Sequence, residues 1–159
     1  DTELPNTIIG ILSLYEVPHE YITLEVTEGS MIKNPDLAME VLSRLAEMGI
    51  KISIDDFGTG FSSLAYLKNL PASEVKIDKS FVFDMLESES DAVIVKSIID
   101  LGHNLSLNVV AEGVEDKETL LALKTLRCDV IQGFYFSRPL SNDGFLDWIA
   151  AKRKKTRAA

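Results

Sequence analysis

The sequence has 159 residues, 46% hydrophobic and 26% charged, which is typical of one soluble globular domain with a real core. Its formal net charge of −9 argues against non-specific binding to nucleic-acid backbones, because that activity needs a basic face. A single cysteine, Cys128, excludes an internal disulfide framework, and no apolar run is long enough to span a membrane. No signal-peptide pattern opens the chain, so we expect a cytoplasmic domain, whose parent is free to carry a membrane anchor elsewhere.

The first third of the chain alternates helix and strand. Apolar residues at helical spacing predict a helix over residues 5–15, and a β-rich run predicts a strand over 21–26. Glu25 lies inside that strand, where an unpaired acid would be costly if buried. A second apolar stripe predicts a helix over residues 35–48, which Gly49 ends.

The stretch from Ile52 to Gly60 is the most distinctive in the sequence. A short apolar strand reaches two adjacent acids, Asp55 and Asp56, and then a loop in which glycines permit a sharp bend. Two neighbouring acids repel each other unless a cation lies beside them, and Mg²⁺ and Mn²⁺ take oxygen ligands. For two acids on their own, the alternative is an Asx-type turn that bonds only local backbone.

The rest of the chain repeats a strand followed by a helix. Predicted strands cover residues 73–77, 107–111 and 130–131. Predicted helices cover residues 61–70, 78–86, 91–105, 116–126 and 141–149. We expect the domain to comprise residues 1–150, and the basic residues 151–159 to form a disordered tail or a fraying helix end.

This alternation indicates a mainly parallel sheet with helices outside it. A Rossmann-like open sheet is the alternative, but no Gly-x-Gly-x-x-Gly loop follows any predicted strand. A barrel gathers residues at strand ends on one rim, where its active sites lie. The polar residues that lie in or just past the predicted strands are Glu25, Asp55, Asp56, Lys76, Glu112 and Gln132. We therefore expect an α/β fold of the TIM type, here an incomplete (β/α) barrel of about five strand-helix units after an N-terminal helix.

Five motifs follow one another in a recognisable order. They are Leu24-Glu-Val-Thr-Glu28, Asp55-Asp-Phe-Gly-Thr-Gly60, Val75-Lys-Ile-Asp78, Ala111-Glu-Gly-Val-Glu115 and Gln132-Gly-Phe-Tyr-Phe-Ser-Arg-Pro139. The series resembles the EAL-domain family of cyclic di-GMP phosphodiesterases over about residues 1–148. Five motifs at matching spacing are far more specific than any one of them.

The resemblance implies a centre that holds two divalent cations, Mg²⁺ or Mn²⁺. Glu25 would ligate one metal ion, Asp55 would bridge both, Asp56 would hold the second, and Glu112 would also ligate at this centre. Such ions would neutralise charge on a phosphate and activate a water molecule. The implied reaction is hydrolysis of cyclic di-GMP to the linear dinucleotide pGpG.

The resemblance also implies roles for three residues that are not metal ligands. Lys76 would hydrogen-bond and help activate the attacking water, Gln132 would position the substrate or its phosphate, and Glu28 would anchor a regulatory loop. The loop consists of Phe57, Gly58, Thr59, Gly60, Phe61, Ser62 and Ser63. In the family this loop links dimer contacts to metal occupancy.

Taken singly, these residues have simpler explanations. Glu25 could pair with a lysine across the sheet, and Lys76 could be a solvent-facing lysine at a strand end. Glu112 could belong to a plain turn, Gln132 could satisfy backbone groups, and Glu28 could cap a loop. The order of the motifs favours the site interpretation for all but Glu28, which stays open.

Four other residues stand outside the motif series as site candidates. His19 and His103 are expected on the surface or beside helix ends rather than as metal ligands. Tyr135 and Trp148 are expected in core packing rather than as platforms for stacked bases.

The sequence departs from the family pattern at its start. The Glu-Ala-Leu segment and a metal-binding Asn, both of which precede this region in the family, are absent. We therefore expect the C-terminal three-fifths of the domain, without about three barrel strands and two ligands of the first metal, and inactive in this form. The alternative function is a non-catalytic module that binds cyclic di-GMP or mediates dimerisation.

Open sheet edges predict a partner, because unpaired strands and an uncovered apolar face favour association. We expect a homodimer, either domain-swapped or paired edge to edge. The resemblance also implies an upstream diguanylate cyclase or sensor domain in the parent protein.

Overall fold

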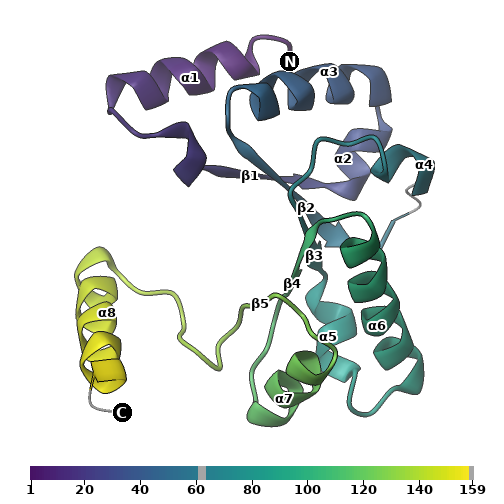
Figure 1. Ribbon diagram of the computed structural model, residues 1–159, viewed down its shortest axis with the longest axis vertical. Coiled ribbons are helices and arrows are strands. Elements are labelled where there is room, and N and C mark those ends of the chain that lie inside the picture. The colour runs from purple at the N-terminus through teal and green to yellow at the C-terminus, as the bar shows by residue number, and fades with distance from the viewer. Residues whose placement is uncertain (61–63, 158–159) are drawn as a thin grey trace.

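The fold is built on one parallel sheet of five strands, shown in the computed structural model of Figure 1, which describes residues 1–60 and 64–157. The strands are β1 (Thr23–Thr27), β2 (Lys51–Phe57), β3 (Glu74–Ile77), β4 (Asn108–Ala111) and β5 (Val130–Ile131). They are hydrogen-bonded in the order in which they occur in the chain, and every pairing is parallel. Sequential parallel strands joined by helices form the wall of a (β/α) barrel, as the sequence predicts.

Helices connect all the strands of the described chain. They are α1 (Leu4–Leu14), the 3₁₀ helix η1 (His19–Tyr21), α2 (Glu28–Ile32), α3 (Pro35–Glu47), α4 (Leu64–Leu67), α5 (Lys79–Asp84), α6 (Glu89–Asn104), α7 (Lys117–Thr125) and α8 (Asn142–Arg157). In Figure 1, α3 lies beside β1 and β2, α5 to α7 lie beside the later strands, and α8 stands apart from the sheet.

Side-chain caps start several of these helices where the sequence predicts them. The Asn34 side chain accepts a hydrogen bond from the Leu37 amide at 3.3 Å, and Pro35 follows in the first turn of α3. The Asp116 carboxylate accepts from the Thr119 amide at 2.7 Å at the start of α7. These caps satisfy amides that the helix itself leaves unpaired.

The sheet has one apolar face and one polar face. Side chains alternate between the two faces along a strand. Ile54 pairs with Val75, and Val75 pairs with Val109, so these three side chains share the face that packs against the helices. All three are fully buried. The opposite face carries Glu25 and Lys76, so the same strands that build the core also present the polar residues.

Strand β2 contains a bulge at its two acids. Ile54 pairs with Val75 and Phe57 pairs with Ile77, so Asp55 and Asp56 together stand opposite the single residue Lys76. Asp56 has a φ of 54°, in the left-handed region that non-glycine residues rarely adopt. The bulge re-aims the two neighbouring acids, which in a regular strand would point to opposite faces.

Some element boundaries differ from the sequence prediction. Residue 21 belongs to η1, so β1 begins at Thr23, and the short helix α2 follows β1 where the sequence predicts no element. The predicted helix over 61–70 is found only as Leu64–Leu67, and residues 61–63 lie outside the described residues. Helix α8 continues to Arg157, through most of the basic segment.

Candidate active site

Lys76 lies at the centre of three carboxylates that come from three different strands. Its Nζ is 2.8 Å from Glu25 Oε1, 3.1 Å from Asp55 Oδ1 and 2.7 Å from Glu112 Oε1. The Lys76 side chain is only 6% exposed, whereas Asp55 and Glu112 are about one-fifth exposed and Glu25 is 53% exposed. The structure therefore brings together four of the residues that the sequence singles out.

Strand register explains this convergence. Thr27 of β1 pairs with Asp55 of β2, and Lys76 of β3 pairs with Val110 of β4, so all four strands contribute at the same level. Glu112 follows β4 directly, and its amide still donates to the Ile77 carbonyl at 3.4 Å. The four residues thus gather at the carboxyl ends of neighbouring parallel strands, where (β/α) barrels carry their sites.

Electrostatics favour a charged lysine here. Burial alone would lower the pKa of Lys76, but its contacts with the carboxylates of Glu112, Glu25 and Asp55 outweigh that effect and raise the pKa above its ordinary value. One ammonium faces three carboxylates, so the cluster carries an excess of negative charge. Such an excess attracts a further cation.

Asp56 is next to this cluster but pairs with another acid. Its carboxyl lies near the side chain of Asp78, which accepts a 3.0 Å hydrogen bond from the Ser80 amide. Partial desolvation and the neighbouring charges of Asp55 and Asp78 raise the pKa of Asp56. Sequence reasoning gave Asp78 no role at the site, although its position just past β3 matches that of the other acids.

Gln132 is held close to Glu112 through the backbone. The Gln132 amide donates to the Ala111 carbonyl at 2.9 Å, and its carbonyl accepts from the Val114 amide at 3.1 Å. The side chain of Gln132 is exposed, lines a hollow of about 640 Å³ beside β5 and α8, and is not among the contacts of Lys76.

Glu28 contacts the loop that follows β2. It is 3% exposed, and its Oε2 accepts hydrogen bonds from the Gly58 amide at 3.4 Å and the Gly60 amide at 3.2 Å. A Cβ added at Gly60 would lie 2.9 Å from the Glu28 carboxyl carbon. Of the expected regulatory loop, Phe61, Ser62 and Ser63 lie outside the described residues.

The donor chemistry of the cluster fits a hard divalent cation. Its ligand atoms are carboxylate oxygens, and Asp55 Oδ1 is buried without a hydrogen-bond partner among the described residues, with Lys76 Nζ as its polar neighbour. In the part of the chain that the structure describes, however, no three acids, histidines or cysteines are already disposed as a metal-binding set. The ammonium of Lys76 stands at the point on which the oxygens converge.

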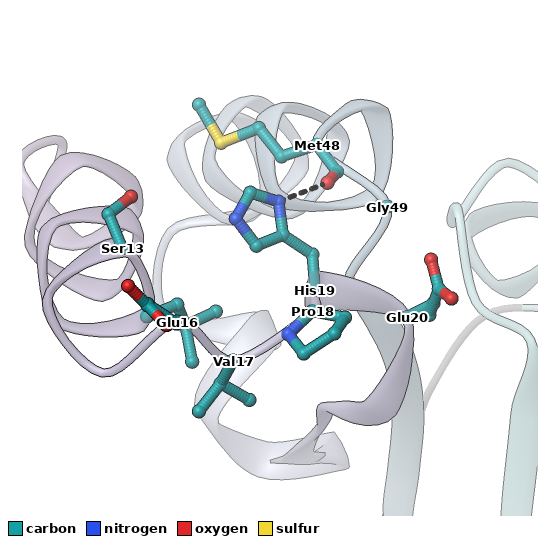
Figure 2. Close-up of a pocket in the computed structure, with 9 residues that line it drawn as sticks. Ser13, Glu16, Val17, Pro18, His19, Glu20, Met48 and Gly49 are labelled. Carbon is teal, nitrogen blue, oxygen red and sulfur yellow. Dashed lines mark hydrogen bonds between the residues drawn. The ribbon is translucent and has the colours of Figure 1, made fainter.

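Both histidines make local contacts away from this cluster. His19 Nδ1 lies 2.9 Å from the Met48 carbonyl oxygen, in a hollow of about 440 Å³ at the amino-terminal side of β1 (Figure 2). Figure 2 shows Glu16 and Glu20 on opposite sides of His19. His103 Nε2 lies 2.9 Å from the carboxylate of Asp129.

The expected core packing is wrong for Tyr135, which is 41% exposed and meets Phe136 edge to face with centroids 5.4 Å apart. Trp148 stacks on Phe145 at 6.4 Å and lines the same hollow as Gln132. Tyr135 and Trp148 both belong to the segment after β5. The apolar residues of this segment resemble core residues in the sequence, so sequence reasoning placed both aromatics in the core.

Fold and site together define a (β/α)-barrel protein with an acidic centre at its strand ends. The EAL-domain family model matches residues 1–139, so the chain belongs to the EAL-domain family. A relative from Pseudomonas aeruginosa, the bifunctional diguanylate cyclase/cyclic di-GMP phosphodiesterase MucR, is 42% identical over 147 residues, which is 92% of this chain and 22% of that protein. The chain thus spans about a fifth of the length of the curated relatives it matches.

Solved structures agree with this placement. The MucR phosphodiesterase in complex with cyclic di-GMP has a TM-score of 0.86 and 42% identity over 89% of this chain and 57% of that chain. A manganese and cyclic di-GMP complex of BlrP1 from Klebsiella pneumoniae has a TM-score of 0.78 and 34% identity over 84% of this chain and 34% of that chain. The described helices include none with the length and apolarity needed to cross a membrane.

Proposed function

We propose that this EAL domain hydrolyses cyclic di-GMP to pGpG with the help of divalent cations. The observation that carries the proposal is the convergence of Glu25, Asp55 and Glu112, from three strands, within 3.1 Å of the Lys76 ammonium. The names of MucR and of the BlrP1 manganese complex support the same substrate and the same kind of cofactor.

Four acids would hold the metal ions, Mg²⁺ or Mn²⁺: Glu25, Asp55, Asp56 and Glu112. Bound divalent cations supply charge neutralisation at the phosphate and lower the pKa of water. Burial and the charges of Asp55 and Asp78 raise the pKa of Asp56, and a divalent cation held there would favour its ionised form.

Residues of the chain itself would position the reactants. Lys76, kept charged by its neighbours, would donate hydrogen bonds to the attacking water and stabilise negative charge that develops on the phosphate. Gln132, exposed beside Glu112, would bind the substrate phosphate. Glu28 would fix the loop after β2, so that the adjoining aspartates keep their places.

The test is hydrolysis of cyclic di-GMP with Mg²⁺ or Mn²⁺, followed by chromatographic separation of pGpG. We expect Asp55→Asn and Lys76→Ala to lower turnover at least about 100-fold, because each removes a charge from the centre of the site. Because the chain spans 57% of the solved MucR chain, the chain and a version extended to the length of that domain are both assayed, and we expect hydrolysis only by the extended version.

A matched control is Asp100→Asn, which neutralises an exposed aspartate that pairs with Lys96 on α6. We expect its turnover to equal that of the unchanged protein. Undiminished hydrolysis by Asp55→Asn would remove the proposed mechanism.

A second candidate is a module that binds cyclic di-GMP, or dimerises, without cleaving the dinucleotide. The placement of Lys76 among the candidate ligands favours it, because the described acids are not already disposed around a metal position. Saturable binding of cyclic di-GMP with no pGpG in either version would support this candidate over hydrolysis.

We also propose that the chain pairs with a second copy, edge to edge or by domain swapping, in the cytoplasm. Within the described residues, the outer strands β1 and β5 each pair on one side only, and α8 stands apart from the sheet (Figure 1). The MucR name supports a parent that also carries a diguanylate cyclase domain.

A further inference from the structure

Lys76 occupies the point that a shared cation would need. Its Nζ lies 2.7–3.1 Å from one oxygen each of Glu25, Asp55 and Glu112, and its side chain is 6% exposed. Divalent Mg²⁺ or Mn²⁺ binds carboxylate oxygens at only about 2.0–2.2 Å. An ammonium and a divalent cation cannot use all three oxygens from the same position.

We propose that Lys76 is the internal cation of the metal-free site and that divalent cations bind in exchange for its carboxylate contacts. This inference rests on the proposed function, since it takes the same acids as metal ligands. It adds a second role for Lys76: the residue that would aid hydrolysis also weakens metal binding.

Charge explains why the metal-free site needs this lysine. Glu25, Asp55 and Glu112 converge from different strands and would repel one another if the ammonium were removed. Burial strengthens that repulsion, because charges interact more strongly away from water. A neutral residue at position 76 should therefore destabilise the metal-free protein, and a bound cation should restore the loss.

Geometry indicates which contact is exchanged first. The Asp55 contact, at 3.1 Å, is the longest of the three, and Asp55 Oδ1 is buried without a hydrogen-bond partner among the described residues. The contacts of Glu25 and Glu112 are shorter, at 2.8 and 2.7 Å. Asp55 is thus the carboxylate that Lys76 holds least well, and the one that Lys76 would release first.

The experiment compares Lys76→Gln with the unchanged protein by calorimetric titration with Mn²⁺ and by thermal unfolding in EDTA and in saturating Mn²⁺. We expect Lys76→Gln to bind Mn²⁺ about ten-fold more tightly, because a repelling and competing charge is gone. We also expect its melting temperature to fall in EDTA and to approach that of the unchanged protein in Mn²⁺. Lys96→Gln, which removes an exposed lysine that pairs with Asp100, is the control and should change neither quantity.

A second measurement does not depend on whether the Lys76→Gln variant folds. The side-chain ammonium of Lys76 is observed by ¹⁵N nuclear magnetic resonance, assigned with the charge-conserving Lys76→Arg. Saturating Mg²⁺ should shift this signal and speed the exchange of its protons with water.

The outcomes separate this inference from the proposed function. Equal or weaker Mn²⁺ affinity of Lys76→Gln, or a Lys76 signal unchanged at saturating Mg²⁺, overturns the exchange while leaving metal-dependent hydrolysis in place. If neither Mn²⁺ nor Mg²⁺ binds the unchanged protein, the proposed metal sites and the exchange both fail.

Discussion

Gly133 lies where the backbone after β5 comes closest to the loop after β4. A Cβ built on Gly133 would be 2.1 Å from the Val114 carbonyl oxygen and 2.4 Å from its nitrogen. Both partners are backbone atoms, so neither can turn aside as a flexible side chain would. Backbone hydrogen bonds of the neighbouring Gln132 to Ala111 and Val114 join the same two segments.

We expect Gly133→Ala to lower the free energy of unfolding by about 3 kcal/mol, because the added methyl forces two backbone segments apart. Denaturant unfolding measures the change. Gly10→Ala on α1 is the control, since a Cβ there meets nothing within 4 Å and alanine favours a helix by up to about 1 kcal/mol. Equal stability of Gly133→Ala and the unchanged protein would contradict the close approach.

At the scale of residues, the sequence predicted which acids gather but not how they are neutralised. Glu25, Asp55 and Glu112 follow from strand alternation and motif order. Pairing of Glu25 with a lysine appeared only as a simpler alternative, yet Lys76 contacts all three acids. Strand register brings these side chains to one face, and the sequence alone does not mark which strands become neighbours in the sheet.

Among the elements, Asp129 ties the start of β4 to the last turn of α6. Its carboxylate accepts a 2.8 Å hydrogen bond from the Val109 amide and lies 2.9 Å from His103 Nε2. Burial alone would raise the pKa of Asp129, but these partners outweigh it and lower the pKa below its ordinary value.

The sign of the pH effect follows from that shift. A carboxyl whose pKa is lower in the folded state adds stability above its unfolded pKa of about 3.9, and this contribution is lost as the pH falls through the folded value. We expect Asp129→Asn to be about 1 kcal/mol less stable at pH 7, a value reduced from that of a buried charged hydrogen bond because the side chain is 37% exposed.

Chemical denaturation between pH 7 and pH 3 measures the stability gap between Asp129→Asn and the unchanged protein. The gap should narrow as the pH falls below about 4. Asp147→Asn, on the exposed surface of α8, should show no gap at any pH. A gap that fails to narrow between about pH 4 and pH 3 would be incompatible with the lowered pKa.

Elements with caps and clear periodicity could be predicted from the sequence. Helices α3 and α7 begin after Asn34 and Asp116 as expected, because those side chains cap them. Helix α2 could not be predicted from the sequence, because its five residues, which include Gly29 and Ser30, show no helical periodicity. Tertiary contacts, with Glu28 buried against the next loop, decide its conformation.

For the whole molecule, the open edges of the sheet predict self-association. Val130 of β5 is 45% exposed, and the segment after it exposes Phe134 and Phe136. We expect size-exclusion chromatography with light scattering to give the mass of a dimer. Val130→Lys should shift the protein towards the monomer, because a lysine on an edge strand opposes strand pairing.

Val93→Lys on α6 is the matched control, since Val93 is 58% exposed but lies away from either edge strand. Its mass should equal that of the unchanged protein. A stable monomer of the unchanged protein in dilute buffer would count against pairing.

The architecture of the whole chain was the most predictable feature, because regular alternation of strands and helices leaves few topologies. The separation of α8 from the sheet could not be predicted, because the apolar residues of α8, such as Phe145, resemble core residues in sequence. Composition alone cannot distinguish an apolar side chain that is buried in the fold from one that stays exposed to solvent.

The bulge in β2 lowers the stability of the sheet but supplies an acid to the candidate active site. Loss of Asp56 would leave one residue opposite Lys76, regularise the ladder between β2 and β3, and remove a backbone conformation with φ of 54°. Selection for heat resistance alone would therefore favour a shortened strand, whereas selection for the acidic centre would keep the extra residue. Laboratory evolution for heat resistance should delete the codon for Asp56, and later selection for the acidic centre should restore it.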